Sequence, residues 1–260
     1  MLLLHLMIPL FKSHSSIGKS ILTLNHPDFC KDGGSDSIFS IAKENKLDQV
    51  TIVEDSLIGF LQAQKVCESL DIQLIFGLRL NVCHKLSKNK KDNSKCTHKV
   101  IIFAKNDDGC KLLNKIYSQA FCEGDGIIDS KNLKKLWSED DLSLAVPFYD
   151  SFIFMNTLHF CNCVPDFSFT SPTFFIEQNF LPFDLHMINK VESYCSEHNF
   201  NSEKVKSIYY NRRKDFEAFQ TYKCICNRRY KQRTLSVPNI DHLASPEFCW
   251  ESYLENNESS

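Results

Sequence analysis

The chain has 260 residues, of which 43% are hydrophobic and 24% are charged, and its formal net charge at pH 7 is −2. This composition is typical of a soluble globular protein, and the nearly balanced charge indicates no particular partner. The length allows one large hydrophobic core, so we expect a single domain. The twelve cysteines are scattered without regular spacing, which favours reduced thiols in a cytoplasmic protein over a disulfide framework.

The first eleven residues, MLLLHLMIPLF, form an apolar stretch. This stretch lacks a basic start and a small-residue cleavage site, so it does not match a secretory signal peptide. It is also much shorter than the ~20 apolar residues that a membrane-spanning helix needs. We expect it to form the first buried strand, and no other stretch is apolar for long enough to predict a membrane helix.

The stretch from Thr51 to Val82 contains the clearest structural unit in the sequence. Residues 51–53 are β-branched, and hydrophobic side chains recur at helical spacing over residues 57–70. The polar residues 54–56 between these two segments suit the start of a helix. From residue 74 to residue 82, hydrophobic and other side chains alternate at strand spacing. Two strands joined by a helix predict a βαβ unit in a parallel sheet.

Strand-like and helix-like stretches alternate through the rest of the chain. Short strands are predicted at residues 98–104, 142–146, 152–155, 173–177 and 205–209. Helices are predicted around residues 38–42, 112–121 and 187–195. Gly59 would cost its helix about 1 kcal/mol relative to alanine, which suggests a close contact there. No linker divides the chain, so we expect one domain over residues 1–255 and a tail over residues 256–260.

Six short motifs follow one another along nearly the whole chain. They occupy residues 12–20, 56–82 with a turn at Gly77, 98–109, 173–178, 206–210 and 242–248. In this order they resemble the PHP (polymerase and histidinol phosphatase) domain at the start of the bacterial DNA polymerase III alpha subunit. Phage-encoded relatives of that subunit look especially similar. The most informative motif is HKVIIFAKNDDG at residues 98–109, because the family has a similar strand followed by an acidic helix start.

The resemblance implies an α/β fold, specifically a single PHP-like distorted (β/α)7 barrel. In active family members, His, Asp and Glu side chains at the strand ends hold metal ions, and metal-bound hydroxide cuts phosphoester bonds. The remnant ligand candidates in this chain are His14, Glu54, Asp55 and His98. Other positions near the expected ligands carry Lys12, Arg79, Ser207 and Tyr209. These residue types do not suit such metals, so the resemblance implies a degenerate metal site.

From these departures we expect a catalytically silent structural or interaction module of a replicative polymerase, acting in DNA replication without a cofactor. Its expected partner is a polymerase core or a proofreading subunit. The carboxylates of nucleotidyl transfer are expected beyond residue 260, so this chain alone is not expected to polymerise DNA. The alternative is a metal-dependent phosphoesterase, a 3′ to 5′ exonuclease that would use Zn or Mn.

A basic and aromatic segment runs from Asn211 to Arg233. Its candidate nucleic-acid-binding residues are Arg212, Arg213, Lys223, Arg228, Arg229 and Lys231. Cations that pair with phosphates and rings that stack on bases are typical of nucleic-acid surfaces. The same pattern also fits a helix with a solvated basic face and a buried aromatic stripe, or a surface for an acidic protein.

Three other motifs indicate different chemistry less strongly. Residues 13–20 end like a phosphate-binding P-loop, but Ser13 stands where that loop needs glycine. Residue types typical of zinc sites occur at Cys83, His84, Cys96, His98 and the Cys-x-Cys pairs 161–163 and 224–226. The one-residue spacing of these pairs does not match a zinc knuckle. His26 has Asp28 nearby, but no Ser or Cys lies in a recognisable nucleophile elbow.

Overall fold

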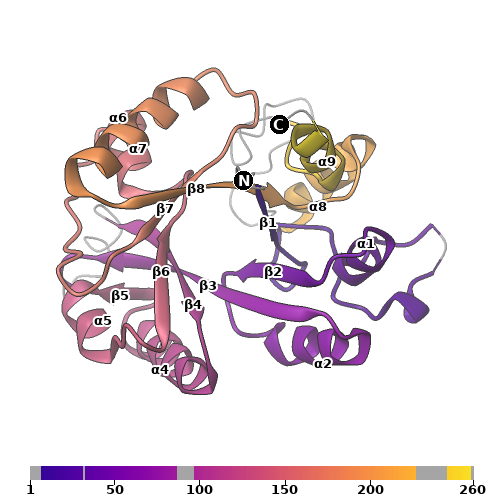
Figure 1. Ribbon diagram of the computed structural model, residues 1–260, viewed down its shortest axis with the longest axis horizontal. Helices are drawn as coiled ribbons and strands as arrows, with labels where there is room; N and C mark the ends of the chain where they lie inside the picture. The colour runs from indigo at the N-terminus through magenta and orange to yellow at the C-terminus, as the bar shows by residue number, and fades with distance from the viewer. Residues whose placement is uncertain (1–6, 32, 87–96, 227–244, 259–260) are drawn as a thin grey trace, which may run out of the picture. The chain divides into compact units, whose positions relative to one another are not determined.

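The computed structural model describes residues 7–31, 33–86, 97–226 and 245–258, and strands and helices alternate along it (Figure 1). The strands are β1 (Ile8–Phe11), β2 (Gln49–Glu54), β3 (Gln73–Cys83), β4 (His98–Ala104), β5 (Ile127–Asp129), β6 (Leu142–Val146), β7 (Thr173–Ile176) and β8 (Asn201–Ile208). The α-helices are α1 (Ile38–Glu44), α2 (Phe60–Leu70), α4 (Asp107–Glu123), α5 (Ser130–Leu136), α6 (Phe152–His159), α7 (Asp184–His198), α8 (Phe216–Cys226) and α9 (Trp250–Glu258). Two short 3-10 helices are η1 (Pro27–Phe29) and η3 (Arg213–Asp215).

The strands are hydrogen-bonded in the order β2-β1-β8-β7-β6-β4-β3-β5, and β2 also pairs with β3. This order returns on itself, so the chain has the barrel-like α/β fold that the sequence predicted. Strand β1 is parallel to β2 and β8, β6 is parallel to β7, and β3 is parallel to β5. Strand β4 is antiparallel to both β3 and β6, which distorts the regular parallel pattern of a βα repeat.

The chain divides into two compact units, which are described separately below. Unit 1 comprises Met1–Ile75, Gln178–Asp184 and Lys204–Ser260, and unit 2 comprises Phe76–Glu177 and Leu185–Glu203. The single PHP-like domain over residues 1–255 stays a prediction. Helix α9 extends to Glu258, so it includes the first residues of the predicted tail. Within the described residues, none of the helices combines the length and the apolar character that a membrane crossing requires.

In unit 1, buried side chains line the parallel strands β1 and β2. Phe11 is fully buried, and the ring of Trp250 from α9 stacks on it at 5.5 Å between ring centroids. Helix α1 begins at Ile38 because the Ser37 side chain caps it by accepting a hydrogen bond from the Phe39 amide. The Tyr253 hydroxyl donates to the Met7 carbonyl oxygen and so also fastens α9 to the start of β1.

The start of helix α2 corrects one prediction and confirms another. Residues 54–56 do not cap α2, which begins at Phe60 after Gly59 and has no side-chain cap. A Cβ atom at Gly59 would lie 2.6 Å from Leu24 Cδ1 and 2.9 Å from Ser15 Oγ. The predicted close contact at Gly59 is therefore confirmed, and it allows the loop after β1 to lie against the start of α2.

In unit 2, strand β4 and helix α4 lie where the sequence predicts them. The Asn106 side chain caps α4 by accepting a hydrogen bond from the Gly109 amide at 2.8 Å. The predicted strand at residues 152–155 is wrong, because this segment forms the start of α6. The Ser151 side chain caps that helix by accepting from the Phe154 amide. A four-residue apolar run has no periodicity that distinguishes a strand from a buried helical turn.

Candidate functional site

The ends of two parallel strands bring together polar side chains in unit 1. Phe11 pairs with Ile52, so the residues that follow β1 lie beside the end of β2. The Lys12 ammonium donates to Asp55 Oδ1 at 2.9 Å, and the Ser13 amide donates to Glu54 Oε1 at 2.7 Å. These two hydrogen bonds join residues that are 43 and 41 positions apart in the sequence, and they do so at one edge of the sheet. We call Lys12, Ser13, Ser16, Glu54 and Asp55 the strand-end cluster.

Glu54 is the centre of the strand-end cluster and is fully buried. Its Oε1 atom accepts from the Ser13 amide, and its Oε2 atom accepts from the Ser16 hydroxyl. The Ser16 oxygen in turn accepts from the Asp55 amide at 2.9 Å. Burial raises the pKa of Glu54, and the positive charge of Lys12 and the hydrogen bonds from Ser13 and Ser16 oppose that rise. Glu54 therefore fastens the loop after β1 to the end of β2.

Lys12 supplies the positive charge of the strand-end cluster. Its side chain is only 4% exposed, whereas that of its partner Asp55 is 31% exposed. A divalent cation needs carboxylate oxygens directed at a common point, with no competing fixed cation between them. Here one carboxylate is paired with an ammonium group and the other accepts from an amide and a hydroxyl. These residues do not fit the metal ions that the PHP resemblance implies.

His14 belongs to the same loop, but it adds no ligand to the strand-end cluster. Its side chain is exposed, and its Nδ1 atom lies 3.2 Å from the Leu22 carbonyl oxygen. Tyr209, another position near the expected ligands, follows β8 and is 8% exposed. Its ring stacks on that of Phe248 at 5.4 Å between centroids. His14 and Tyr209 therefore have local structural contacts in unit 1.

His98 and Arg79 lie in unit 2. In the antiparallel pair of β3 and β4, His98 is opposite Val82 and Arg79 is opposite Ile101. Because opposite residues share a face and faces alternate along a strand, His98 and Arg79 project from opposite faces of the pair. The Arg79 guanidinium donates to Asp150 Oδ2 at 3.0 Å. His98 therefore does not share a site with Arg79.

His98 contacts the ring of Phe152 and the sulfur atom of Cys163. His98 is 3% exposed, and burial lowers the pKa of its imidazole to about 4. Its Nδ1 atom lies 3.2 Å from Cys163 Sγ. Among the described residues that the sequence suggested for zinc, His98 and Cys163 are in contact, and Cys96 lies outside the described residues. Throughout the part of the chain that the structure describes, no group of three or more His, Cys, Asp and Glu side chains is placed to hold a metal ion.

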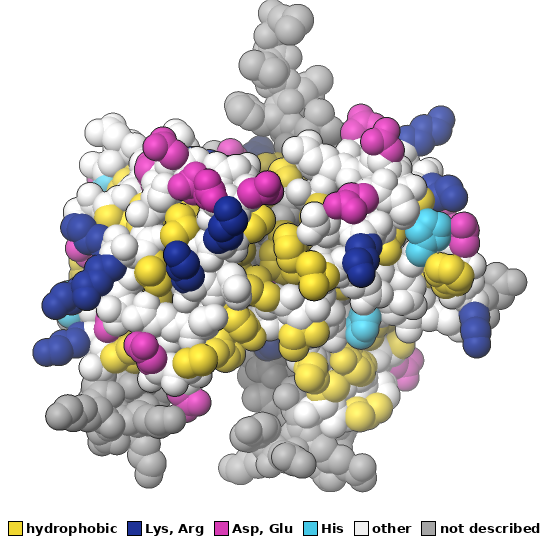
Figure 2. All heavy atoms as spheres, turned by 90° about the horizontal axis from the view of Figure 1, so that it is seen from below, with side chains coloured by type: hydrophobic (Ala, Val, Ile, Leu, Met, Phe, Trp, Pro, Cys, Tyr) yellow, Lys and Arg dark blue, Asp and Glu magenta, His cyan; other side chains and the backbone are white. Residues whose placement is uncertain are grey.

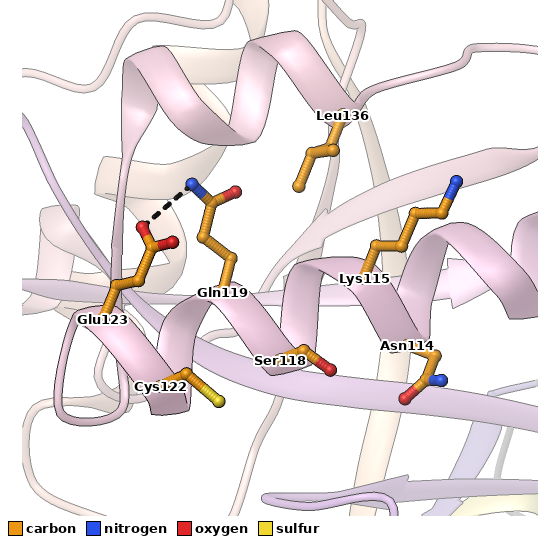
Figure 3. A pocket seen from close by; sticks show the side chains of 7 residues that line it. All are labelled: Asn114, Lys115, Ser118, Gln119, Cys122, Glu123 and Leu136. Carbon is orange, nitrogen blue, oxygen red and sulfur yellow. Dashed lines mark hydrogen bonds between the residues drawn. The ribbon is translucent and has the colours of Figure 1, made fainter.

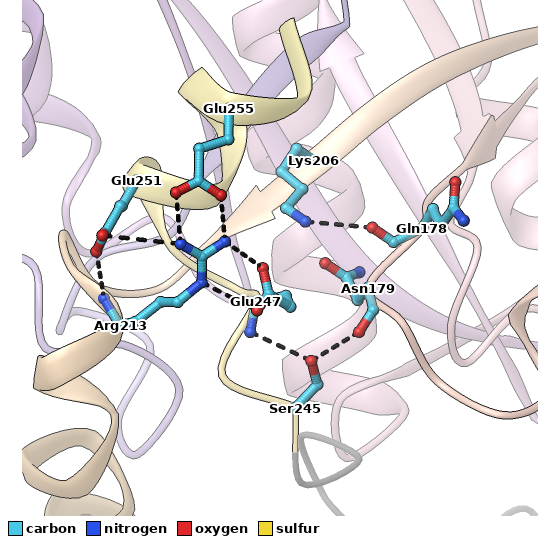
Figure 4. A network of polar contacts seen from close by, with 8 residues as sticks. All are labelled: Gln178, Asn179, Lys206, Arg213, Ser245, Glu247, Glu251 and Glu255. Carbon is cyan, nitrogen blue, oxygen red and sulfur yellow. Dashed lines mark hydrogen bonds and ion pairs between the residues drawn. The ribbon is translucent and has the colours of Figure 1, made fainter. Parts of the chain in front are cut away.

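The described basic residues of the 211–233 segment make different contacts from those predicted. The Arg213 guanidinium donates two hydrogen bonds to Glu247 and two to Glu255 (Figure 4). Lys223 is 1% exposed, and its Nζ atom lies 5.6 Å from the centre of the Phe219 ring. Arg212 is exposed. Three further predicted residues, Arg228, Arg229 and Lys231, lie outside the described residues.

The acidic partners of Arg213 were not predicted from the sequence. Glu251 and Glu255 lie four residues apart on one face of α9, and Glu247 lies in the turn before that helix. Glu251 completes the group, because its Oε2 atom accepts from the Arg213 amide at 2.9 Å. The same part of unit 1 contains the fully buried Lys206, whose Nζ atom donates to the Gln178 carbonyl oxygen (Figure 4).

The described surface includes a face of mixed charge (Figure 2) and a shallow hollow. On the face shown in Figure 2, basic and acidic side chains are interspersed and do not separate by sign. A surface hollow in unit 2 is lined by residues of α4 and by Leu136 of α5 (Figure 3). Its Gln119 amide donates to Glu123 Oε2 at 3.3 Å, and the two side chains project from α4 and meet at their ends (Figure 3). This hollow contains no buried polar group directed at a ligand.

Comparisons with known proteins do not assign the chain to a family. No protein-family model matches it, and no curated protein matches it. The interpretation as a PHP domain therefore depends on the order of the motifs and on the barrel-like α/β fold.

Proposed function

We propose that this chain is a PHP-like module of a DNA polymerase III alpha subunit that acts in DNA replication as a structural or interaction module, not as a hydrolase. The barrel-like α/β fold and the order of the six motifs support the family interpretation. The strand-end cluster supports the silent role, because it occupies the ends of β1 and β2, where the resemblance implies metal ligands.

The ion pair between Lys12 and Asp55 is the observation that carries this proposal. A lysine ammonium neutralises a carboxylate and holds two loops together, as a structural metal ion would. An ammonium group is not a Lewis acid, so it does not coordinate a water molecule and convert it to hydroxide. Lys12 therefore supplies the structural effect of a cation without the chemistry of phosphoester hydrolysis.

Two exposed isoleucines support a role in protein contact. Ile17 follows Ser16 of the strand-end cluster and is 75% exposed, and Ile58 lies three residues after Asp55 and is 76% exposed. The cluster therefore fixes the two loops that present these side chains. Apolar side chains on rigid loops contribute to protein interfaces because they bury area with little loss of conformational freedom. The proposed partner is a polymerase core or a proofreading subunit.

DNA is a second proposed partner through the basic segment. Arg213 and Lys223 do not support it, because the former binds three glutamates and the latter is buried. This proposal therefore depends on the exposed Arg212 and on the basic residues outside the described part of the chain.

A nuclease assay distinguishes a silent module from a phosphoesterase. We expect the purified chain to leave single-stranded DNA intact in the presence of added Mn²⁺. We expect His98→Ala to lower the free energy of unfolding by at most about 1–2 kcal/mol through its lost hydrogen bond. Glu54→Gln is the second variant in this assay, because Glu54 and His98 are the two candidate metal ligands that are buried. DNA degradation that stops in both variants would support the phosphoesterase and contradict the silent role.

A further inference from the structure

A buried thiol and a buried imidazole are in direct contact in unit 2. Cys163 is 8% exposed and His98 is 3% exposed. The 3.2 Å distance from Cys163 Sγ to His98 Nδ1 is a hydrogen-bonding distance. A thiol next to a base is the arrangement in which sulfur becomes a nucleophile, because the base takes its proton as sulfur reacts.

Both members of this pair are held in place. The Asn156 side chain of α6 binds the backbone of Cys163 twice, donating to its carbonyl oxygen at 2.8 Å and accepting from its amide at 3.0 Å. His98 is the first residue of strand β4, and its ring packs edge-on against the ring of Phe152, with 6.0 Å between the ring centroids. The contact between sulfur and nitrogen is thus fixed by a strand, a helix and a clamped loop.

We infer that Cys163 is a modification site at which hydroperoxides oxidise the thiol to a sulfenic acid, with His98 Nδ1 as the proton acceptor. This inference is independent of the proposed role in replication. The contact geometry supports it, since the His98 tautomer protonated at Nε2 presents an unprotonated Nδ1 atom to Cys163 Sγ at 3.2 Å.

The reaction balances without any further group. The Cys163 proton moves to His98 Nδ1, and a sulfur electron pair attacks one peroxide oxygen. The S–O bond forms as the O–O bond breaks, and the leaving oxygen takes the proton from His98. Sulfur loses two electrons and the peroxide is reduced, so hydrogen peroxide gives water and an alkyl hydroperoxide gives an alcohol.

Cys195 provides a matched control within the same unit. It is 5% exposed, so its burial is similar to that of Cys163. Burial and the charge of Glu192 raise its pKa to about 11. Burial alone would therefore make both thiols unreactive. Cys122, which is exposed on α4, reports the behaviour of an accessible thiol.

The test treats the full-length Cys161→Ser chain with hydrogen peroxide in the presence of dimedone, which captures sulfenic acids, and quantifies each cysteine by mass spectrometry. The Cys161→Ser change removes the nearest thiol in the loop, which would otherwise condense with the sulfenic acid. We expect Cys163 to be labelled at least about tenfold faster than Cys195, and His98→Gln to remove this advantage.

If Cys163 and Cys195 are labelled at equal rates in the Cys161→Ser chain, which retains His98, the inference is overturned. This outcome does not depend on whether a His98 variant folds. An unchanged ratio in His98→Gln would also overturn the inference. The labelling of Cys195 relative to Cys122 reports whether the His98→Gln chain is folded, because Cys195 reaches the rate of Cys122 only if unit 2 opens.

Discussion

Replacing Lys12 with methionine should lower the free energy of unfolding by about 2–3 kcal/mol, the largest effect that we expect from one substitution in unit 1. Methionine keeps most of the side-chain length but leaves Asp55 without its buried ammonium partner. The expected loss is below that of a fully buried pair, because the Asp55 side chain is 31% exposed and recovers part of its hydration. Chemical denaturation at neutral pH measures the change.

Two further variants show whether the loss comes from the ion pair. Lys19→Met removes a less buried lysine from the same loop and should change stability by less than about 0.5 kcal/mol. The double variant Lys12→Met/Asp55→Asn removes both charges and should recover part of the stability that Lys12→Met loses. A double variant less stable than Lys12→Met alone would show that the two side chains act independently.

Replacing Arg213 with methionine should lower the free energy of unfolding by about 1–2 kcal/mol, because it removes the cation shared by three glutamates. The most affected of these is Glu247, whose side chain is only 12% exposed. Lys214→Met, at the exposed neighbouring position, is the matched control and should have little effect. Equal losses in the two variants would contradict a specific role for Arg213 in fastening helix α9.

The effect of Arg213 should depend on pH in a defined direction. Its hydrogen bonds lower the pKa of Glu247 from the ordinary value of 4.5, and they also lower the pKa of Glu255. A carboxylate with a lowered pKa in the folded state stabilises the fold above its unfolded pKa and loses that contribution as pH falls through the folded pKa. The stability difference between the unsubstituted chain and Arg213→Met should therefore shrink as pH falls below 4.5. A difference that grows in acid would contradict this account.

The elements that the sequence predicts best are those with a long periodic pattern. Helix α4 has an Asn cap and hydrophobic side chains over several turns, and the sequence within β3 alternates over residues 74–82. The segment at residues 152–155 was predicted wrongly because a cap at Ser151, and not its short apolar run, decides its structure. Strand β5 was missed because three residues contain no period.

The composition of the candidate sites was only partly predictable. The motif order indicated Glu54 and Asp55, but their partners Ser16 and Lys12 are 38 and 43 residues away in sequence. His98 and Cys163 are 65 residues apart, so their contact depends on how α6 and its following loop lie against β4. Such pairings follow from tertiary structure, and local spacing contains no signal for them.

The metal content of the purified full-length chain tests the central claim most directly. After dialysis against Zn²⁺ and Mn²⁺ and removal of unbound ions, elemental analysis should find no stoichiometric Zn, Mn or Fe, because Lys12 already neutralises Asp55 and Glu54 already accepts two hydrogen bonds. Glu54→Gln should give the same result. Two or more metal ions per chain, reduced in Glu54→Gln, would contradict the account and restore the strand-end cluster as a metal centre.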